Sequence, residues 1–153
     1  MVGGLPDRVL VYDAVADSWE LAGWLNQPRT HHAVSAVKGH VYAMGGTHGN
    51  PVLTHVERYD VVTDSWTVIA PLATSRYRHT SCAYDDKFWV FGGMRVSSSG
   101  NETELASVEI YDPDTEVWQA GTSTPASNWG MECVVHNDKI YLIAGALNKN
   151  GFV

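Results

Sequence analysis

The stretch YDVVTDSW at residues 59–66 has a Trp seven residues after the Tyr of a Tyr-Asp pair. Related stretches occur at residues 12–19 (YDAVADSW) and 111–118 (YDPDTEVW), so the copies are spaced by 47 and then by 52 residues. Self-similarity at such a spacing indicates stacked supersecondary units. The chain is therefore expected to be a repeat array whose function depends on one of its faces.

A pair of small residues follows a short apolar run in each copy. The runs are VYAMGG (41–46), FWVFGG (88–93) and IYLIAG (140–145), and Gly3-Gly4 resembles the end of one more. Glycine has no Cβ, so these pairs are expected where two backbones approach closely or where φ is positive at a strand end.

Short apolar runs alternate with turn residues in every copy, which is typical of β-strands. The clearest copy predicts strands at residues 31–37, 41–46 and 54–60, and Trp66 begins a fourth. The first two strands of each copy are joined by residue pairs that suit tight hairpins, namely Lys38-Gly39, Asp85-Asp86 and Asn137-Asp138. Four short antiparallel strands per copy make one blade of a β-propeller.

Aromatic side chains are expected to hold neighbouring blades together, because a buried Tyr or Trp removes roughly 150–250 Å² from water. Tyr59 and Trp66 are the candidate anchors. A ligand-stacking ladder is the alternative role of the tryptophans, and their regular recurrence favours the structural role. The residues assigned to the repeat itself are Tyr12, Tyr59, Tyr111, Trp19, Trp66, Trp118, Gly45, Gly46, Gly92 and Gly93.

The composition is that of a folded domain. The chain has 153 residues, of which 44% are hydrophobic, and a formal net charge of −7. Nonspecific nucleic-acid binding depends on clustered Lys and Arg, so no nucleic-acid partner is expected. No membrane association is expected either, since no apolar stretch approaches the roughly 18 residues of a spanning helix and the N-terminus lacks a signal-peptide pattern.

Two cysteines, Cys82 and Cys133, occur without CxxC or metal-like spacing. We interpret both as small buried thiols in a reducing compartment, with a disulfide as the alternative. The chain is therefore expected to be cytoplasmic. The triplet Asn101-Glu102-Thr103 matches the acceptor pattern for N-glycosylation and supports an extracellular alternative.

The copies resemble the kelch repeat. The resemblance rests on Arg29-Thr-His-His32 with Gly45-Gly46, on Arg76-Tyr-Arg-His79 with Gly92-Gly93, and on the Tyr-Asp and Trp positions. It covers nearly the whole chain and implies an all-β fold, a kelch-type β-propeller fragment with four-stranded antiparallel blades. The last copy departs from the pattern, with Asn128-Trp-Gly-Met131 for Arg-x-x-His and Ala144-Gly145 for the Gly pair.

The copies divide the chain into two complete blades, residues 23–70 and 71–121, and two half-blades. The half-blade at 1–22 supplies a third and a fourth strand, and that at 122–153 supplies a first and a second. Kelch propellers resemble rings of five to seven blades. The two complete blades and two half-blades of this chain amount to three blades, too few to close such a ring. We expect a fragment of a longer protein, with self-association as the alternative, and an isolated chain that is poorly soluble or oligomeric.

One face of each blade holds the connections between its second and third strands and those between successive blades, and we call it the front face. It collects Arg and aromatic residues, which suit recognition of a peptide, especially an acidic one. For Arg29 and Arg76 a structural role in the repeat is an equal alternative. The predicted partner-binding residues are Arg29, Thr30, His31, Thr47, His48, Arg76, Tyr77, Arg78, Met94, Arg95, Asn128, Trp129 and Asn148.

The loop at 94–104 is about five residues longer than its counterpart at 47–53. It is either a loop that sets specificity or a flexible Ser-rich linker. No metal site, cofactor or catalytic centre is predicted. His32 and His79 recur with the repeat, and no Ser-His-Asp set, phosphate-binding glycine loop or HExxH motif is present.

The resemblance implies a protein-interaction module, because substrate peptides of kelch adaptors dock on the front face. In the kelch-like group a BTB domain precedes the propeller, and the protein is a substrate adaptor of a cullin-type ubiquitin ligase. Association with BTB and cullin partners is therefore expected only if a BTB domain lies upstream. The alternatives are an actin-binding or other scaffold kelch protein and a metal-dependent or sugar-acting kelch-propeller enzyme.

Overall fold

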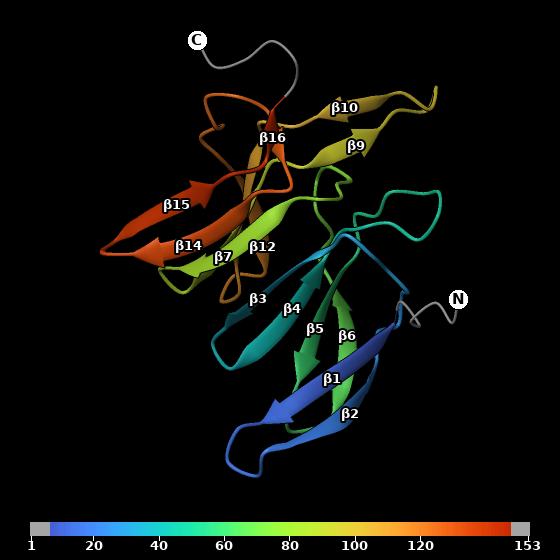
Figure 1. The fold of residues 1–153 in the computed structure, drawn as a ribbon, viewed down its shortest axis with the longest axis vertical. Coiled ribbons are helices and arrows are strands. Elements are labelled where there is room, and N and C mark those ends of the chain that lie inside the picture. Colours follow the sequence, from blue (N-terminus) through green and yellow to red (C-terminus); the bar gives the residue numbers. More distant parts are fainter. Residues whose placement is uncertain (1–6, 148–153) are drawn as a thin grey trace.

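The computed structural model describes residues 7–147 as an all-β chain (Figure 1). Gly3, Gly4 and Asn148, which the sequence analysis singled out, lie outside the described residues. Between residues 7 and 147 no helix is long and apolar enough to cross a membrane. The strands are β1 (Arg8–Asp13), β2 (Ser18–Trp24), β3 (Ala33–Val37), β4 (His40–Met44), β5 (Val56–Asp60), β6 (Ser65–Ile69), β7 (Thr80–Tyr84), β8 (Lys87–Phe91), β9 (Met94–Val96), β10 (Glu102–Glu104), β11 (Val108–Asp112), β12 (Val117–Gly121), β13 (Asn128–Trp129), β14 (Glu132–His136), β15 (Lys139–Ile143) and β16 (Ala146–Leu147).

Two four-stranded antiparallel sheets form the centre of the molecule, as the repeat predicts (Figure 1). One has the order β3-β4-β5-β6 and the other the order β7-β8-β11-β12. The two-stranded sheet β1-β2 precedes them in the chain, and the two-stranded sheet β14-β15 follows them. These are propeller blades, so the predicted fold class is confirmed.

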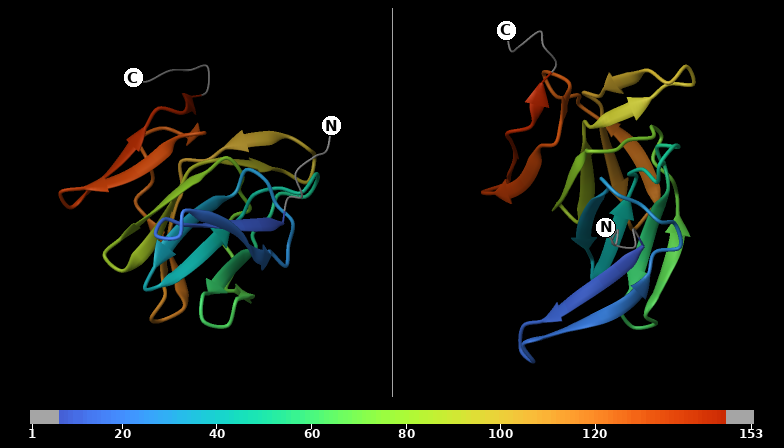
Figure 2. Two further views of the ribbon diagram at one scale, coloured as in Figure 1. Left: turned by 60° about the horizontal axis from the view of Figure 1, so that its bottom comes forward. Right: turned by 45° about the vertical axis from the view of Figure 1, so that its right-hand side comes forward.

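The first strands of successive sheets lie side by side, β3 next to β7 and β7 next to β14 (Figure 2). The hydroxyl oxygens of Ser35 on β3 and Ser81 on β7 are 2.7 Å apart and share a hydrogen bond. This arrangement brings the segments that lead into each sheet to one place on the front face.

The tight hairpins form where the sequence predicts them. The non-glycine residues at the three joints adopt φ values between 48° and 55°, at Lys38, Asp85, Asp86, Asn137 and Asp138, and Gly39 has a φ of 76°. The turn between the third and fourth strands is held by Asp60, whose carboxylate accepts the backbone N–H of Val62 at 2.8 Å. Local turn chemistry therefore fixes the strand ends.

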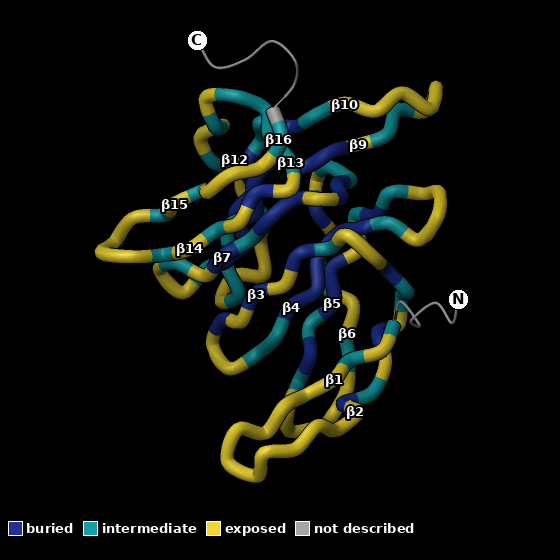
Figure 3. Tube along the Cα trace, in the orientation of Figure 1, coloured by how far each residue is buried: buried dark blue, intermediate teal, exposed yellow. Residues whose placement is uncertain are grey.

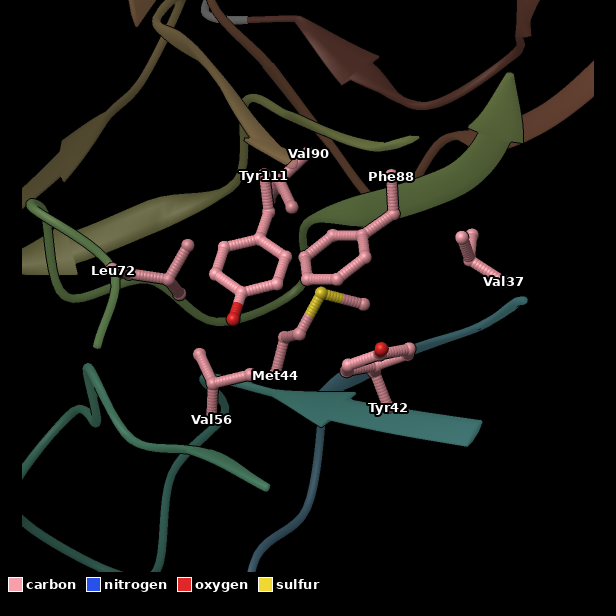
Figure 4. Packing of buried hydrophobic residues seen from close by; sticks show 8 residues of the cluster. All are labelled: Val37, Tyr42, Met44, Val56, Leu72, Phe88, Val90 and Tyr111. Carbon is pink, nitrogen blue, oxygen red and sulfur yellow. The ribbon is translucent and has the colours of Figure 1, made fainter. Parts of the chain in front are cut away.

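The main core lies between the two four-stranded sheets (Figure 4). The Phe88 ring is fully buried, with its centroid 4.8 Å from that of Tyr42 in the other sheet and 4.7 Å from that of Tyr111 in its own. The cluster comprises Val37, Tyr42, Met44, Val56, Leu72, Phe88, Val90 and Tyr111. Each sheet thus buries one face against its neighbour.

The repeat tryptophans are buried to the extent that a neighbouring sheet covers them. Trp118 packs on the main core, and its Nε1 donates to the carbonyl O of Ala70, 2.8 Å away in the preceding repeat. Trp66 is half-buried beside Tyr59. Trp19 is 69% exposed, because among the described residues no preceding sheet lies against β1-β2 (Figure 3).

The two cysteines correct the sequence interpretation. Cys82 on β7 and Cys133 on β14 form a disulfide between neighbouring sheets, with Cα atoms 5.8 Å apart. That separation is usual for natural disulfides. The prediction of two free thiols was wrong because the two residues are 51 positions apart and meet only when successive sheets pack.

The long loop after the second Gly pair is an ordered hairpin and not a flexible linker. Strands β9 and β10 pair in register, with Arg95 opposite Thr103. The tip is closed by backbone N–H groups of Ser97 and Gly100, which donate to the carbonyl O atoms of Asn101 and Ser97 at 2.9 Å.

Replacement of Phe88 by Ala is expected to lower the free energy of unfolding by about 3–5 kcal/mol, since it leaves a cavity between the sheets. Val62→Ala is the matched control, because Val62 is exposed in the β5–β6 turn and should cost no more than about 0.5 kcal/mol. Urea unfolding followed by tryptophan fluorescence measures both. Equal effects would contradict the assignment of the core.

Candidate functional site

Two of the predicted binding residues are buried inside the blades. Arg29 and Arg76 are 1% and 0% exposed, so neither guanidinium reaches a partner. Arg29 Nη2 lies 2.5 Å from Glu57 Oε1, and Arg76 Nη2 lies 2.6 Å from Glu109 Oε1. A buried charge needs such a partner. Arg29 and Arg76 therefore have the structural role in the repeat, and their prediction as partner-binding residues is corrected.

The two ion pairs hold the segments that lead into each sheet. Glu57 also accepts the backbone N–H groups of Asn26 and the next residue, at 2.7 and 3.1 Å. Glu109 accepts the equivalent groups of Ala73 and its successor, at 2.7 and 3.2 Å. Neither Glu residue is predicted from the sequence, although each stands two positions before a repeat Tyr.

These segments form a hydrogen-bonded ladder at the front face. The N–H of Arg78 donates to the carbonyl O of His31, and the N–H of Gly130 donates to the carbonyl O of Arg78, both at 2.8 Å. The three residues hold equivalent places in successive repeats, and their φ values are 54°, 53° and 66°. A left-handed backbone at a non-glycine residue is uncommon, and the ladder maintains it here.

The Gly pairs leave room for this ladder. A Cβ on Gly46 would lie 2.6 Å from the carbonyl O of Thr30, and one on Gly93 would lie 2.7 Å from that of Tyr77. Both glycines also have φ near 90°. Glycine is therefore required at both positions, because the backbone of the ladder segment, at Thr30 and at Tyr77, passes directly over it.

Four side chains of the ladder form a cluster that we call the rim cluster: His31, Tyr77, Arg78 and Trp129. The Cζ of Arg78 lies 4.9 Å from the centroid of the Trp129 ring and 5.7 Å from that of Tyr77. The His31 and Tyr77 rings meet edge to face, with centroids 6.4 Å apart. Arg78 and His31 are exposed, so a cation supported by aromatic rings faces solvent. Tyr77 is only 8% exposed, so it supports the Arg78 guanidinium, which corrects its prediction as a residue that contacts a partner directly.

Four other predicted residues lie on segments that adjoin the rim cluster. Thr30 and Thr47 pair through their backbones, with N–H to O distances of 2.8 and 2.9 Å. His48 and Arg95 are exposed on the segments that follow the Gly pairs.

Two further predicted residues face inward. Met94, the first residue of β9, is buried, which corrects its prediction as a binding residue. Its backbone N–H and carbonyl O pair with those of Tyr77 at 2.9 Å. Asn128 is half-buried at the position equivalent to Arg29 and Arg76, and its Nδ2 donates to the carbonyl O of Ala144 at 3.2 Å.

A polar groove of about 750 Å³ lies between the 47–53 loop and the β9–β10 hairpin. The Tyr77 hydroxyl donates to Glu102, which connects the groove to the rim cluster. Burial raises the pKa of Tyr77, and the Glu102 hydrogen bond raises it further, so the phenol stays protonated at neutral pH. The groove is lined chiefly by Asn50, Pro51, Val52, Ser75, Val96 and Glu102.

Positive charge on the front face is available for binding. Among residues 7–147, neither Arg78 nor Arg95 forms an ion pair. At the opposite edge, Lys38 is paired with Asp114, and Lys87 lies 3.3 Å from Asp112. In the same part of the chain, no group of three or more His, Cys, Asp or Glu side chains is arranged to hold a metal ion.

His32 and His79 stand at equivalent positions beside the buried arginines. Burial, with a contribution from the charge of Arg76, lowers the pKa of His79 to about 3. Burial, with a contribution from Arg29, lowers the pKa of His32 to about 4. Both imidazoles are therefore neutral at neutral pH.

The amino-acid sequence is similar to those of several known proteins. The family model described as "KLHDC2/KLHL20/DRC7 Kelch-repeats domain" matches residues 6–145. Alpha-scruin of Limulus polyphemus is 29% identical over 141 residues, which cover 90% of this chain and 15% of that protein. Kelch-like protein 23 of Homo sapiens is 29% identical over 139 residues, covering 91% and 25%. An F-box/kelch-repeat protein of Arabidopsis thaliana is 33% identical over 137 residues, covering 84% and 32%.

This chain thus spans a third or less of the length of these three relatives. Among solved structures, that titled "Structure of YjhT" matches with a TM-score of 0.75 and 18% identity. The match covers 89% of this chain and 50% of the other. At that identity the likeness concerns the fold alone.

The free energy of unfolding is expected to fall as the pH decreases from about 7 to about 5. In an unfolded chain His has a pKa near 6.5 and takes up a proton in this range, whereas folded His32 and His79 do not. Each contributes a slope of up to about 1.4 kcal/mol per pH unit. Urea unfolding at several pH values should show a shallower slope for His79→Gln, and an unchanged slope would contradict the burial of a neutral imidazole.

Proposed function

The chain belongs to the kelch-repeat family, and we propose that it is a non-catalytic module that binds a partner protein or peptide through the rim cluster. The observation that carries the proposal is Arg78, an exposed guanidinium over the rings of Tyr77 and Trp129 with no ionic partner in the described part of the chain. A guanidinium that is already oriented binds a carboxylate through two hydrogen bonds. The partner segment therefore contains Asp or Glu.

The polar groove extends the proposed contact surface. A peptide whose carboxylate meets Arg78 reaches the groove along Tyr77 and Glu102, which join the two regions. Arg95 and His48 are exposed at its borders and supply further polar contacts. The rigid rings of the rim cluster are the expected centre of the binding energy.

We further propose that the module is the substrate-recognition part of a cullin-type ubiquitin ligase adaptor. Similarity to a kelch-like protein and to an F-box/kelch-repeat protein supports this role. Association with a cullin would depend on a BTB domain upstream of the repeats. Co-purification of a cullin with the full-length protein tests the role, and its consistent absence would contradict it.

The division of the chain into blades at 1–22, 23–70, 71–121 and 122–153 is also a proposal. It is supported by two four-stranded sheets whose strands fall within the two middle ranges.

A cytoplasmic location follows from the adaptor role and is proposed with it. The Cys82–Cys133 disulfide favours the extracellular alternative, because a reducing cytoplasm keeps most thiols free. Thiol labelling in intact cells is expected to modify both cysteines if the protein is cytoplasmic. Protection of both from the label until a reductant is added would place the protein in an oxidising compartment.

Arg78→Ala is expected to weaken binding by at least about tenfold, the value of one charged hydrogen bond. The probe is a peptide selected from a random library by the wild-type chain, and selected peptides should be rich in Asp and Glu. Lys139→Ala is the matched control, because it removes one exposed positive charge from the opposite edge. Selection without acidic residues, or equal binding by Arg78→Ala, would contradict the proposal.

A further inference from the structure

The first strands of successive sheets are linked through the same pair of repeat positions, but by two different chemistries. Between β3 and β7, the hydroxyl oxygens of Ser35 and Ser81 lie 2.7 Å apart and share a hydrogen bond. Cys82 stands 47 residues after Ser35, and Cys133 stands 52 residues after Ser81, which are the two spacings of the repeat. The Cys82–Cys133 disulfide between β7 and β14 therefore takes the place of the serine pair.

This replacement makes one junction between sheets depend on the redox state. The hydrogen bond of a serine pair forms under oxidising and reducing conditions alike, whereas a cysteine pair is either a disulfide or two thiols. A thiol is only a weak hydrogen-bond donor and acceptor. The reduced pair therefore holds β14 against β7 less firmly than either the disulfide or a pair of serines.

The disulfide lies at matching positions behind the two halves of the rim cluster. Cys82 follows Arg78 by four residues, and Cys133 follows Trp129 by four residues. The Cζ of Arg78 lies 4.9 Å from the centroid of the Trp129 ring, and the N–H of Gly130 donates to the carbonyl O of Arg78 at 2.8 Å. A covalent bond between β7 and β14 therefore fixes the two segments that carry the cation and this ring.

The second ring beside the cation does not depend on the disulfide. Tyr77 directly precedes Arg78 in the chain, and its hydroxyl donates to Glu102 on β10. Tyr77 thus keeps its place beside Arg78 whether or not β14 is tied to β7. The disulfide therefore controls only the contact between Arg78 and Trp129.

We propose that Cys82 and Cys133 are a reversible redox pair that regulates partner binding at the rim cluster, an inference that rests on the function proposed above. In the disulfide form, Trp129 is held beside the Arg78 guanidinium before a partner arrives, which lowers the cost of ordering the site. In the dithiol form, β14 moves away from β7 more readily and this cost returns. The oxidised protein therefore binds an acidic peptide more tightly than the reduced protein.

The oxidant is a small disulfide such as oxidised glutathione. Cys82 is 8% exposed and Cys133 is half-buried, so the small disulfide reaches Cys133 first. The Cys133 thiolate attacks one sulfur of the small disulfide, forms a mixed disulfide and expels one thiolate. The Cys82 thiolate then attacks Sγ of Cys133 and expels the second. Two electrons pass to the small disulfide, and the two protons of the cysteine pair end on the two released thiols.

The reverse exchange with reduced glutathione opens the bond by the same two steps. Transient, redox-sensing disulfides are the kind that occur in a reducing cytoplasm. The pair is therefore compatible with the cytoplasmic location proposed above, where it is a dithiol until the glutathione pool becomes oxidised.

Peptide binding measured in mixtures of reduced and oxidised glutathione tests the proposal. The probe is the acidic peptide selected as described above, and labelling of free thiols gives the fraction of protein in each form. The dissociation constant should be at least about threefold higher for the dithiol form, because the segment of Trp129 must then be ordered on binding. Arg78→Ala should weaken binding in both forms.

A double variant, Cys82→Ser with Cys133→Ser, is the matched control, because it rebuilds the hydrogen-bonded pair of the β3–β7 junction. Its dissociation constant should be the same with and without oxidised glutathione. Trp129→Ala should also abolish the difference between the two forms, since it removes the ring that the disulfide positions. Tyr77→Phe should keep the difference, because Tyr77 is held independently of β14.

Hydrogen exchange at the backbone N–H of Gly130, measured without peptide, separates the redox effect from partner binding. It should be at least about threefold slower in the disulfide form, since that form holds the bond to Arg78 closed. Equal exchange in the two forms would overturn the proposal. Slower exchange in a protein that binds no acidic peptide in either form would overturn the proposed function, and with it the regulation of binding, but not the effect of the disulfide on the rim cluster.

Three further results would contradict the proposal. A disulfide that does not form in excess oxidised glutathione, or that excess reduced glutathione does not open, would exclude a reversible pair. Equal dissociation constants for the two forms would exclude regulation. A redox response that persists in the double Ser variant would place the redox-sensitive group elsewhere.

Discussion

The packing of one four-stranded sheet against the next is the constraint on which the rest of the structure depends. A sheet of four short strands has two faces and cannot bury either by itself. Between the complete sheets, Phe88 packs against Tyr42 across the boundary, and Trp118 reaches the preceding repeat. Where no neighbour is described, the equivalent residues Tyr12 and Trp19 are exposed. The same side chains are therefore core or surface according to what lies beside their sheet.

Buried ion pairs connect this packing to the front face. Glu57 and Glu109 hold both the Arg and the backbone of the segment that enters their sheet. Each segment then runs across a glycine pair and turns through a left-handed residue. The left-handed residues His31 and Arg78 are exposed, whereas His79, which follows Arg78, is buried. The rim cluster forms where two such segments lie beside the segment that carries Trp129, which is joined to them by the hydrogen bond from Gly130 to Arg78. Its geometry therefore depends on groups that never meet a partner.

The features predictable from sequence were those fixed by neighbouring residues. The hairpins at Lys38 and Asp85 and the turn at Asp60 follow from local φ preferences and side-chain hydrogen bonds. The burial of Arg76 and the pairing of Cys82 could not be predicted, because each depends on contacts between segments about 30 to 50 positions apart. For the candidate site, the sequence indicated which segments to consider, and the structure shows which of their side chains reach solvent.

Hydrogen exchange measured along the chain tests most directly whether lateral contact between sheets determines stability. The account predicts the slowest exchange in β4, β8 and β11, because these strands lie within the packed sheets. It predicts faster exchange in β1, which among the described residues pairs only with β2 and carries the exposed Tyr12. Exchange in β8 as fast as in β1 would contradict it.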